Sequence, residues 1–73
     1  MNKEELLELE KNLKMYFNGN KKSYLKALLR SVGIEQNELY YKTGYHFSDV
    51  KTIEDLLDIR NTLERYYYVS NNF

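Results

Sequence analysis

The sequence predicts an all-α fold: a small bundle of four or five short helices. Apolar residues recur at three- and four-residue steps, no proline interrupts them, and no alternating apolar run is long enough for a strand. The 73 residues suffice for one domain, and no cysteine can form a disulfide or a thiolate zinc site. The fold must therefore be held together by a helix-packed core or by a partner.

The first two helices are predicted from apolar stripes and their stop signals. The first covers residues 3–17 and ends at Asn18-Gly19-Asn20, since Asn and Gly tolerate left-handed backbone. Its apolar face consists of Leu6, Leu9, Leu13, Tyr16 and Phe17. The second covers residues 24–32, with Ser23 as its N-cap and a Schellman ending at Gly33-Ile34. Its stripe consists of Leu25, Leu28, Leu29 and Val32.

Two further helices and an ambiguous link follow. A short helix is expected over residues 36–43, with Leu39 inward and Gly44 as its stop. The last helix is expected over residues 53–68, begun by a capping box of Thr52 with Asp55. Its apolar face consists of Ile53, Leu56, Leu57, Ile59, Leu63, Tyr66 and Tyr67. Residues 45–51 form either a fifth, one-turn helix capped by Ser48 or a loop, and residues 69–73 are expected to be a flexible tail.

Two blocks of the sequence resemble the helix-turn-helix domain of Cro and the phage repressors. Residues 33–44, GIEQNELYYKTG, are similar to the family's pattern across its first two helices, and residues 52–63, TIEDLLDIRNTL, are similar to its fourth helix. With the stripe from Leu25 to Val32 as a first helix, the resemblance covers residues 23–63. It implies a helix-turn-helix-like bundle over residues 23–68, preceded by an added N-terminal helix over residues 1–20.

The segment that would read DNA departs from this family. Residues 45–51 stand for a recognition helix and loop of roughly twice that length, whereas several base contacts need about two helical turns. A second register would place Val50 and Ile53 on the recognition helix but would remove the fourth helix. Tyr40 stands where the family keeps Ala at a close helix crossing, and Lys51 is the one basic residue of the segment. The resemblance therefore implies a helix-turn-helix scaffold with a shortened recognition helix.

Charge is balanced overall but unevenly distributed. Eleven Lys and Arg residues offset eleven Asp and Glu residues, whereas a non-specific DNA binder usually carries a positive excess. Four cations without an acid lie within residues 19–34 and are candidates for phosphate or acidic-partner contacts: Lys21, Lys22, Lys26 and Arg30. An acidic group lies within residues 45–59: Asp49, Glu54, Asp55 and Asp58. Both groups are also explained as solvated helix faces.

The aromatic residues after Leu39 are the strongest candidates for a partner-binding site. The chain holds eight Tyr and three Phe, and Tyr is favoured at interfaces because it offers a rigid apolar ring with a polar tip. We expect a partner-binding site composed of Tyr40, Tyr41, Tyr45, His46, Phe47 and Lys51. The alternative is that two or three of these rings wedge the short helices together. Residues 66–68 are consecutive tyrosines, so at least one should be exposed and available to a dimer or partner contact.

The sequence offers no constellation for catalysis. His46, Ser48 and Asp49 lie on one short turn that cannot also build a substrate cleft. The acids near His46 lack a metal-ligand spacing, and the glycines are isolated helix stops rather than a phosphate-binding loop. We therefore expect no enzymatic activity, no cofactor and no metal.

These features favour a small cytoplasmic regulatory protein of phage or mobile-element type that acts by binding a protein, in the manner of an antirepressor. A DNA-binding transcriptional regulator is the first alternative. An inhibitor that uses the acidic end to mimic nucleic acid before a host nuclease or polymerase is the second. We expect no membrane span and no signal peptide, while a homodimer remains compatible with the surplus of Tyr.

Overall fold

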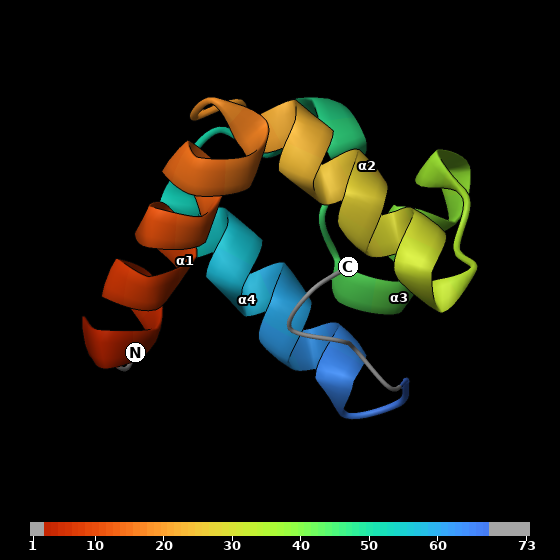
Figure 1. The fold of residues 1–73 in the computed structure, drawn as a ribbon. Helices are drawn as coiled ribbons and strands as arrows, with labels where there is room; N and C mark the ends of the chain where they lie inside the picture. Colours follow the sequence, from red (N-terminus) through yellow and green to blue (C-terminus); the bar gives the residue numbers. More distant parts are fainter. Residues whose placement is uncertain (1–2, 68–73) are drawn as a thin grey trace.

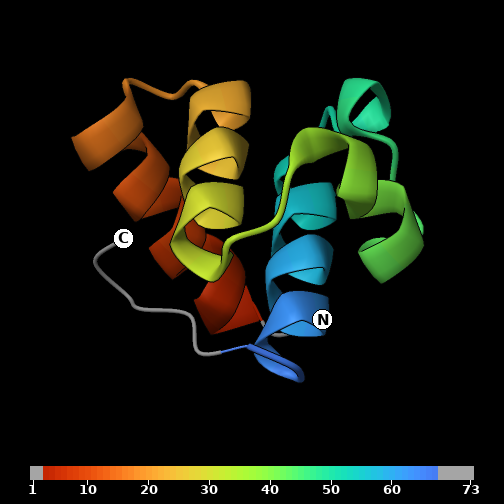
Figure 2. The same cartoon turned by 90° about the vertical axis from the view of Figure 1, so that its right-hand side faces the viewer.

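The computed structural model describes residues 3–67, which form helices joined by short turns and contain no strand. Three longer helices, α1 (Lys3–Phe17), α2 (Lys21–Val32) and α4 (Ile53–Glu64), make up most of the structure. A short helix, α3 (Leu39–Thr43), lies on the side of α4 that faces away from α1 (Figure 1, Figure 2). Two 3-10 turns, η1 (Gln36–Glu38) and η2 (Phe47–Asp49), precede and follow α3. The predicted all-α class is confirmed.

One continuous core joins all four helices. Helix α1 packs against α2 and α4, and α4 also contacts α2 and α3. The buried side chains are Leu9, Leu13, Tyr24, Leu25, Leu28, Leu29, Ile34, Leu39, Val50, Leu56, Leu57, Ile59 and Leu63. Because Leu9 and Leu13 of α1 lie in this core, the N-terminal helix is part of the same packed unit as the helices that follow it.

Helix α1 has the predicted bounds, but one residue of its predicted apolar face is exposed. Phe17 packs against the core and places its ring 5.3 Å from that of Tyr24. Successive helical residues are about 100° apart around the axis, so Tyr16 cannot share this inward position. Tyr16 is 67% exposed, and the prediction that it faces the core is wrong.

Helix α2 begins three residues before the predicted start. The side-chain Oδ1 of Asn20 accepts a hydrogen bond from the Ser23 N–H at 3.0 Å, so Asn20 is the N-cap and Ser23 lies in the first turn. The prediction of Ser23 as N-cap is therefore wrong. Lys21 and Lys22 belong to the helix, and Tyr24, which the prediction placed first, is almost fully buried.

The predicted glycine stops after α1, α2 and α3 are confirmed, and Gly19 adopts a left-handed φ of 76° just after α1. Gly33 adopts a left-handed φ of 76°, and the N–H of Ile34 donates to the carbonyl of Leu29 at 3.0 Å, as a Schellman ending requires. Gly44 adopts a φ of 82°, and its N–H donates to the carbonyl of Tyr40 at 2.8 Å. Gly44 thereby reverses the chain directly after α3.

The predicted helix over residues 36–43 changes type along its length, because η1 is a 3-10 turn that continues into α3. The link over residues 45–51 contains only the three-residue turn η2, which begins after His46 and is not capped by Ser48. Val50 closes this turn and is buried in the core. The chain between Gly44 and Thr52 thus returns to the core instead of forming a helix of two turns.

Helix α4 starts as predicted and ends earlier than predicted. The Thr52 Oγ1 accepts from the Asp55 N–H at 3.1 Å and Asp55 Oδ2 accepts from the Thr52 N–H at 3.3 Å, which confirms the capping box. The prediction of helix to Tyr68 is wrong over residues 65–67, because the N–H groups of Tyr66 and Tyr67 both donate to the carbonyl of Leu63 and close a turn. Tyr66 is exposed and Tyr67 packs against the core. Residues 68–73, and with them the predicted tail, lie outside the described residues.

Candidate functional site

Helix α3 exposes two adjacent tyrosines because its first residue is anchored inward. Leu39 is fully buried, and each following residue turns about 100° further around the axis. Tyr40 therefore lies at the flank of the helix with 46% of its surface exposed, and Tyr41 faces solvent with 85% exposed. Tyr40 and Tyr41 therefore lie outside the core, at the surface of the molecule.

An exposed cluster of three rings forms around Tyr40. The chain reversal at Gly44 brings the His46 ring onto the Tyr40 ring, with centroids 4.2 Å apart and planes 7° from parallel. The Tyr41 ring meets Tyr40 edge-on at 5.8 Å. Both arrangements are favourable aromatic geometries. Tyr40, Tyr41 and His46 are all exposed, and we refer to these three residues as the aromatic patch.

Tyr45 and Phe47 hold the segment that carries His46 against the body of the molecule. The Tyr45 hydroxyl donates to Asp58 Oδ2 of α4 at 2.6 Å. On the other side, Phe47 packs against the core, its carbonyl accepts a hydrogen bond from the Lys22 ammonium, and the centre of its ring lies 4.7 Å from the Lys22 Nζ. These two partly buried residues are wedges between helices, which was the alternative interpretation for these rings, and their role as partner contacts stays a prediction.

The other residues predicted to contact a partner are Lys51, which lies between η2 and α4, and four cations on α2. Lys51 is exposed and its backbone N–H donates to Asp55 Oδ2 at 3.2 Å, while no ring contact or side-chain hydrogen bond joins it to the aromatic patch within residues 3–67. Of the four predicted basic contacts, Lys21 and Lys22 are partly buried on α2. Lys26 and Arg30 are exposed further along the same helix.

The predicted acidic end is partly used inside the fold. Asp55 accepts hydrogen bonds from the N–H groups of Lys51 and Thr52, and the bond from Lys51 is the main cause that lowers the pKa of Asp55. Asp58 accepts from Tyr45. Two of the four acids therefore serve as a helix cap and a helix contact.

No family model, no curated protein and no solved structure matches this chain. The site is therefore interpreted from its own chemistry. Within residues 3–67, no group of three acidic or histidine side chains is placed to hold a metal ion. None of the helices in this range is sufficiently long and apolar to span a bilayer.

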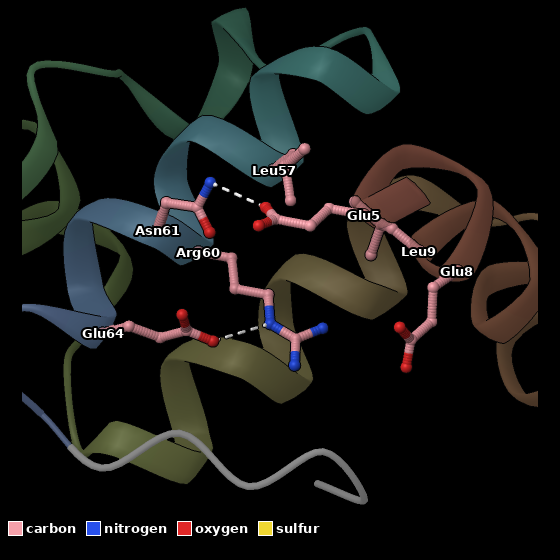
Figure 3. A pocket seen from close by; sticks show the side chains of 7 residues that line it. All are labelled: Glu5, Glu8, Leu9, Leu57, Arg60, Asn61 and Glu64. Atoms are coloured by element: carbon pink, nitrogen blue, oxygen red, sulfur yellow. Dashed lines mark hydrogen bonds and ion pairs between the residues drawn. The ribbon is translucent and has the colours of Figure 1, made fainter. Parts of the chain in front are cut away.

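A polar hollow lies between α1 and α4 and was not predicted from the sequence (Figure 3). Several of its polar side chains form hydrogen bonds that join the helices. Arg60 crosses it, donating through Nε to Glu64 at 3.1 Å and through its guanidinium to the Tyr24 hydroxyl at 3.1 Å. Asn61 donates to Glu5 across the same gap at 3.3 Å. The Arg60–Glu64 spacing is visible in the sequence, but Tyr24 lies 36 residues from Arg60, so only the fold brings those two together.

The hydrogen bond between Tyr45 and Asp58 is expected to show in a pH titration. It is the main cause that raises the pKa of Tyr45 to about 12, from an ordinary value of about 10. Because the folded state holds the proton more tightly, this contribution to stability is complete below about pH 10 and is lost as the pH rises towards 12. Replacement of Asp58 by Ala is expected to return the midpoint towards 10.

The measurement is an NMR titration of protein labelled at the tyrosine ring carbons, with Tyr45→Phe assigning the signal. An unchanged midpoint in Asp58→Ala would contradict the assigned contact. Asp49→Ala is the matched control, because it removes a neighbouring acid that makes no hydrogen bond to Tyr45.

Proposed function

We propose that this protein is a small regulatory protein that binds another protein through the aromatic patch, as an antirepressor of phage or mobile-element type does. The observation that carries the proposal is the stacked, exposed arrangement of Tyr40, Tyr41 and His46. Exposed aromatic clusters usually mark partner sites, and Tyr is enriched among the residues that dominate binding energy.

The anchoring of the patch to the core supports this function. Its two elements are each tied to the core: α3 through Leu39, and the His46 segment through Tyr45, Phe47 and Val50. A surface that is already ordered loses little conformational freedom when a partner docks. A rigid tyrosine surface is therefore better suited to binding a folded partner than a mobile loop of the same composition.

The short segment between residues 33–44 and 52–63, the two blocks that resemble the phage-repressor family, favours a protein partner over DNA. Reading base edges in the major groove needs about two helical turns, whereas residues 45–51 hold one 3-10 turn whose final neighbour, Val50, is buried. The engagement of Lys22 with Phe47 also removes one cation from the group expected to contact phosphate. The engagement of Asp55 and Asp58 likewise reduces support for an acidic nucleic-acid mimic.

The test is quantitative affinity capture from host and phage lysate with three single variants. Tyr40→Ala and Tyr41→Ala are expected to lower the affinity for the captured protein at least about tenfold, since each removes a ring of the patch. Tyr16→Ala is the matched control, because the exposure of Tyr16, 67%, lies between those of Tyr40 and Tyr41 but the residue lies on α1. Exposed truncations are expected to change the free energy of unfolding by no more than about 0.5 kcal/mol.

Two outcomes would contradict the proposal. One is a captured protein that binds the three variants and the wild-type chain alike. The other is the absence of any captured protein together with tight binding of a DNA duplex, measured by fluorescence anisotropy and weakening steeply with salt, which would favour the transcriptional regulator.

A further inference from the structure

Helix α2 carries a row of cations along its solvent side. Lys22, Lys26 and Arg30 follow at four-residue steps, so they lie along one face of the helix. Lys22 is engaged with Phe47. Lys26 and Arg30 are exposed, have no ion-pair partner within residues 3–67, and belong to a helix that contains no acid. Adjacent like charges on a helix destabilise it slightly, and an anion between them would remove that cost.

A hollow lies between these two cations and the chain that leads to α3. Lys26, Arg30, Glu35 and Gln36 line its walls, and the buried side chains of Leu29 and Ile34 contribute its apolar lining. It is a shallow, open hollow of about 320 Å³. The two cations outnumber the one acid, Glu35, so the hollow attracts a carboxylate. Its apolar lining can also contact an apolar residue next to that carboxylate in the partner.

At each end of the row of cations, a neighbouring residue lies close in the chain to the aromatic patch. Gln36 of the hollow lies four residues before Tyr40 on the continuous helical run of residues 36–43, which is about one turn. At the other end, Lys22 binds Phe47, the residue that follows His46. One partner surface can therefore cover both features together.

We infer that the partner bound by the aromatic patch presents an acidic side chain beside its apolar contact, and that this carboxylate enters the hollow between Lys26 and Arg30. The inference rests on the proposed function and adds the chemistry of the partner to it. The aromatic patch supplies the apolar contact, whereas the two cations select the charge.

The experiment selects a displayed library of random peptides against the immobilised full chain, so that no partner needs to be known. The enriched peptides are expected to carry Asp or Glu next to an apolar residue. Their affinity is expected to fall at least about tenfold for the double variant Lys26→Glu/Arg30→Glu, since the charge at the hollow is reversed. The double variant Lys3→Glu/Lys11→Glu is the matched control, because it makes the same change in net charge on exposed positions of α1.

The outcomes separate failure of this inference from failure of the proposed function. Enriched peptides without an acid that lose affinity in Tyr40→Ala or Tyr41→Ala overturn the inference and leave the proposed function standing. Peptides whose affinity depends neither on Tyr40 and Tyr41 nor on Lys26 and Arg30 overturn both the inference and the proposed function. A DNA duplex whose binding is lost in Lys26→Glu/Arg30→Glu, while peptide binding is not, assigns the cations to nucleic acid and also overturns the inference.

Discussion

Replacing Leu39 by Ala is expected to lower the free energy of unfolding by about 2–5 kcal/mol, the range for truncation of a fully buried leucine. A chain of this length is expected to have a total stability of about 4–11 kcal/mol, so the loss is a large fraction of the whole. Leu39 is also the inward residue of a helix of only five residues that has no side-chain hydrogen bond at its N-cap. The attachment of α3 to α4 therefore depends strongly on this one side chain.

Denaturant unfolding followed by circular dichroism measures the effect. Leu7→Ala is the matched control, because Leu7 is 59% exposed on α1 and its truncation is expected to change stability by no more than about 0.5 kcal/mol. Equal losses in the two variants would show that α3 is not anchored through Leu39. If the anchor is real, the variant should also lose partner binding although all three rings of the aromatic patch are present.

Replacing Arg60 by Met is expected to lower the free energy of unfolding by about 1–3 kcal/mol, because it removes the guanidinium that hydrogen-bonds the buried Tyr24 hydroxyl. Methionine has an unbranched apolar side chain like the stem of arginine, so the substitution removes the hydrogen bonds of the guanidinium and keeps most of the apolar packing. The Arg60–Glu64 pair should contribute little, since Glu64 is substantially exposed and lies one turn away on the same helix.

A double-mutant cycle of Arg60→Met with Tyr24→Phe separates the two contacts. A coupling free energy of at least about 0.5 kcal/mol is expected if the hydrogen bond between α2 and α4 stabilises the fold. Glu64→Gln, the control, is expected to cost no more than about 0.5 kcal/mol. Additive effects of the two variants would contradict a stabilising contact between Arg60 and Tyr24.

The fold was largely predictable because its helices depend on local signals. The bounds of α1, the three glycine stops and the Thr52–Asp55 capping box each follow from a few neighbouring residues. The errors arose where two local signals competed. Asn20 and Ser23 are both good N-caps, and the start at Asn20 places Lys21 and Lys22 in the first turn, where cations oppose the helix dipole, yet Asn20 is the cap.

The end of α4 shows a second limit of local reasoning. The four-residue step from Leu63 to Tyr67 continues the helical period, and Tyr67 does pack against the core. It does so from a turn, because the carbonyl of Leu63 accepts from both Tyr66 and Tyr67. Periodicity alone cannot distinguish a further helical turn from a tight turn that places the same ring inward.

The candidate site was predicted as a group but not residue by residue. The position of Leu39 was sufficient to expect exposure of Tyr40 and Tyr41, because both follow from the geometry of one helix. The roles of Tyr45 and Phe47 depend on Asp58 and Lys22, which are distant in sequence. The same limit applies to the Tyr40–His46 stack, which requires the reversal at Gly44 to have a specific direction.

The packing of α1 on α4 has a consequence for synthesis on the ribosome. Leu9 and Leu13 leave the exit tunnel long before Leu56 and Leu63, with which they share the core. A nascent chain that has released only α1 and α2 must therefore hold apolar side chains in water until α4 emerges. Folding of this core is expected to be completed only after α4 has emerged, and a pause in translation before residue 53 should increase chaperone binding to the nascent chain.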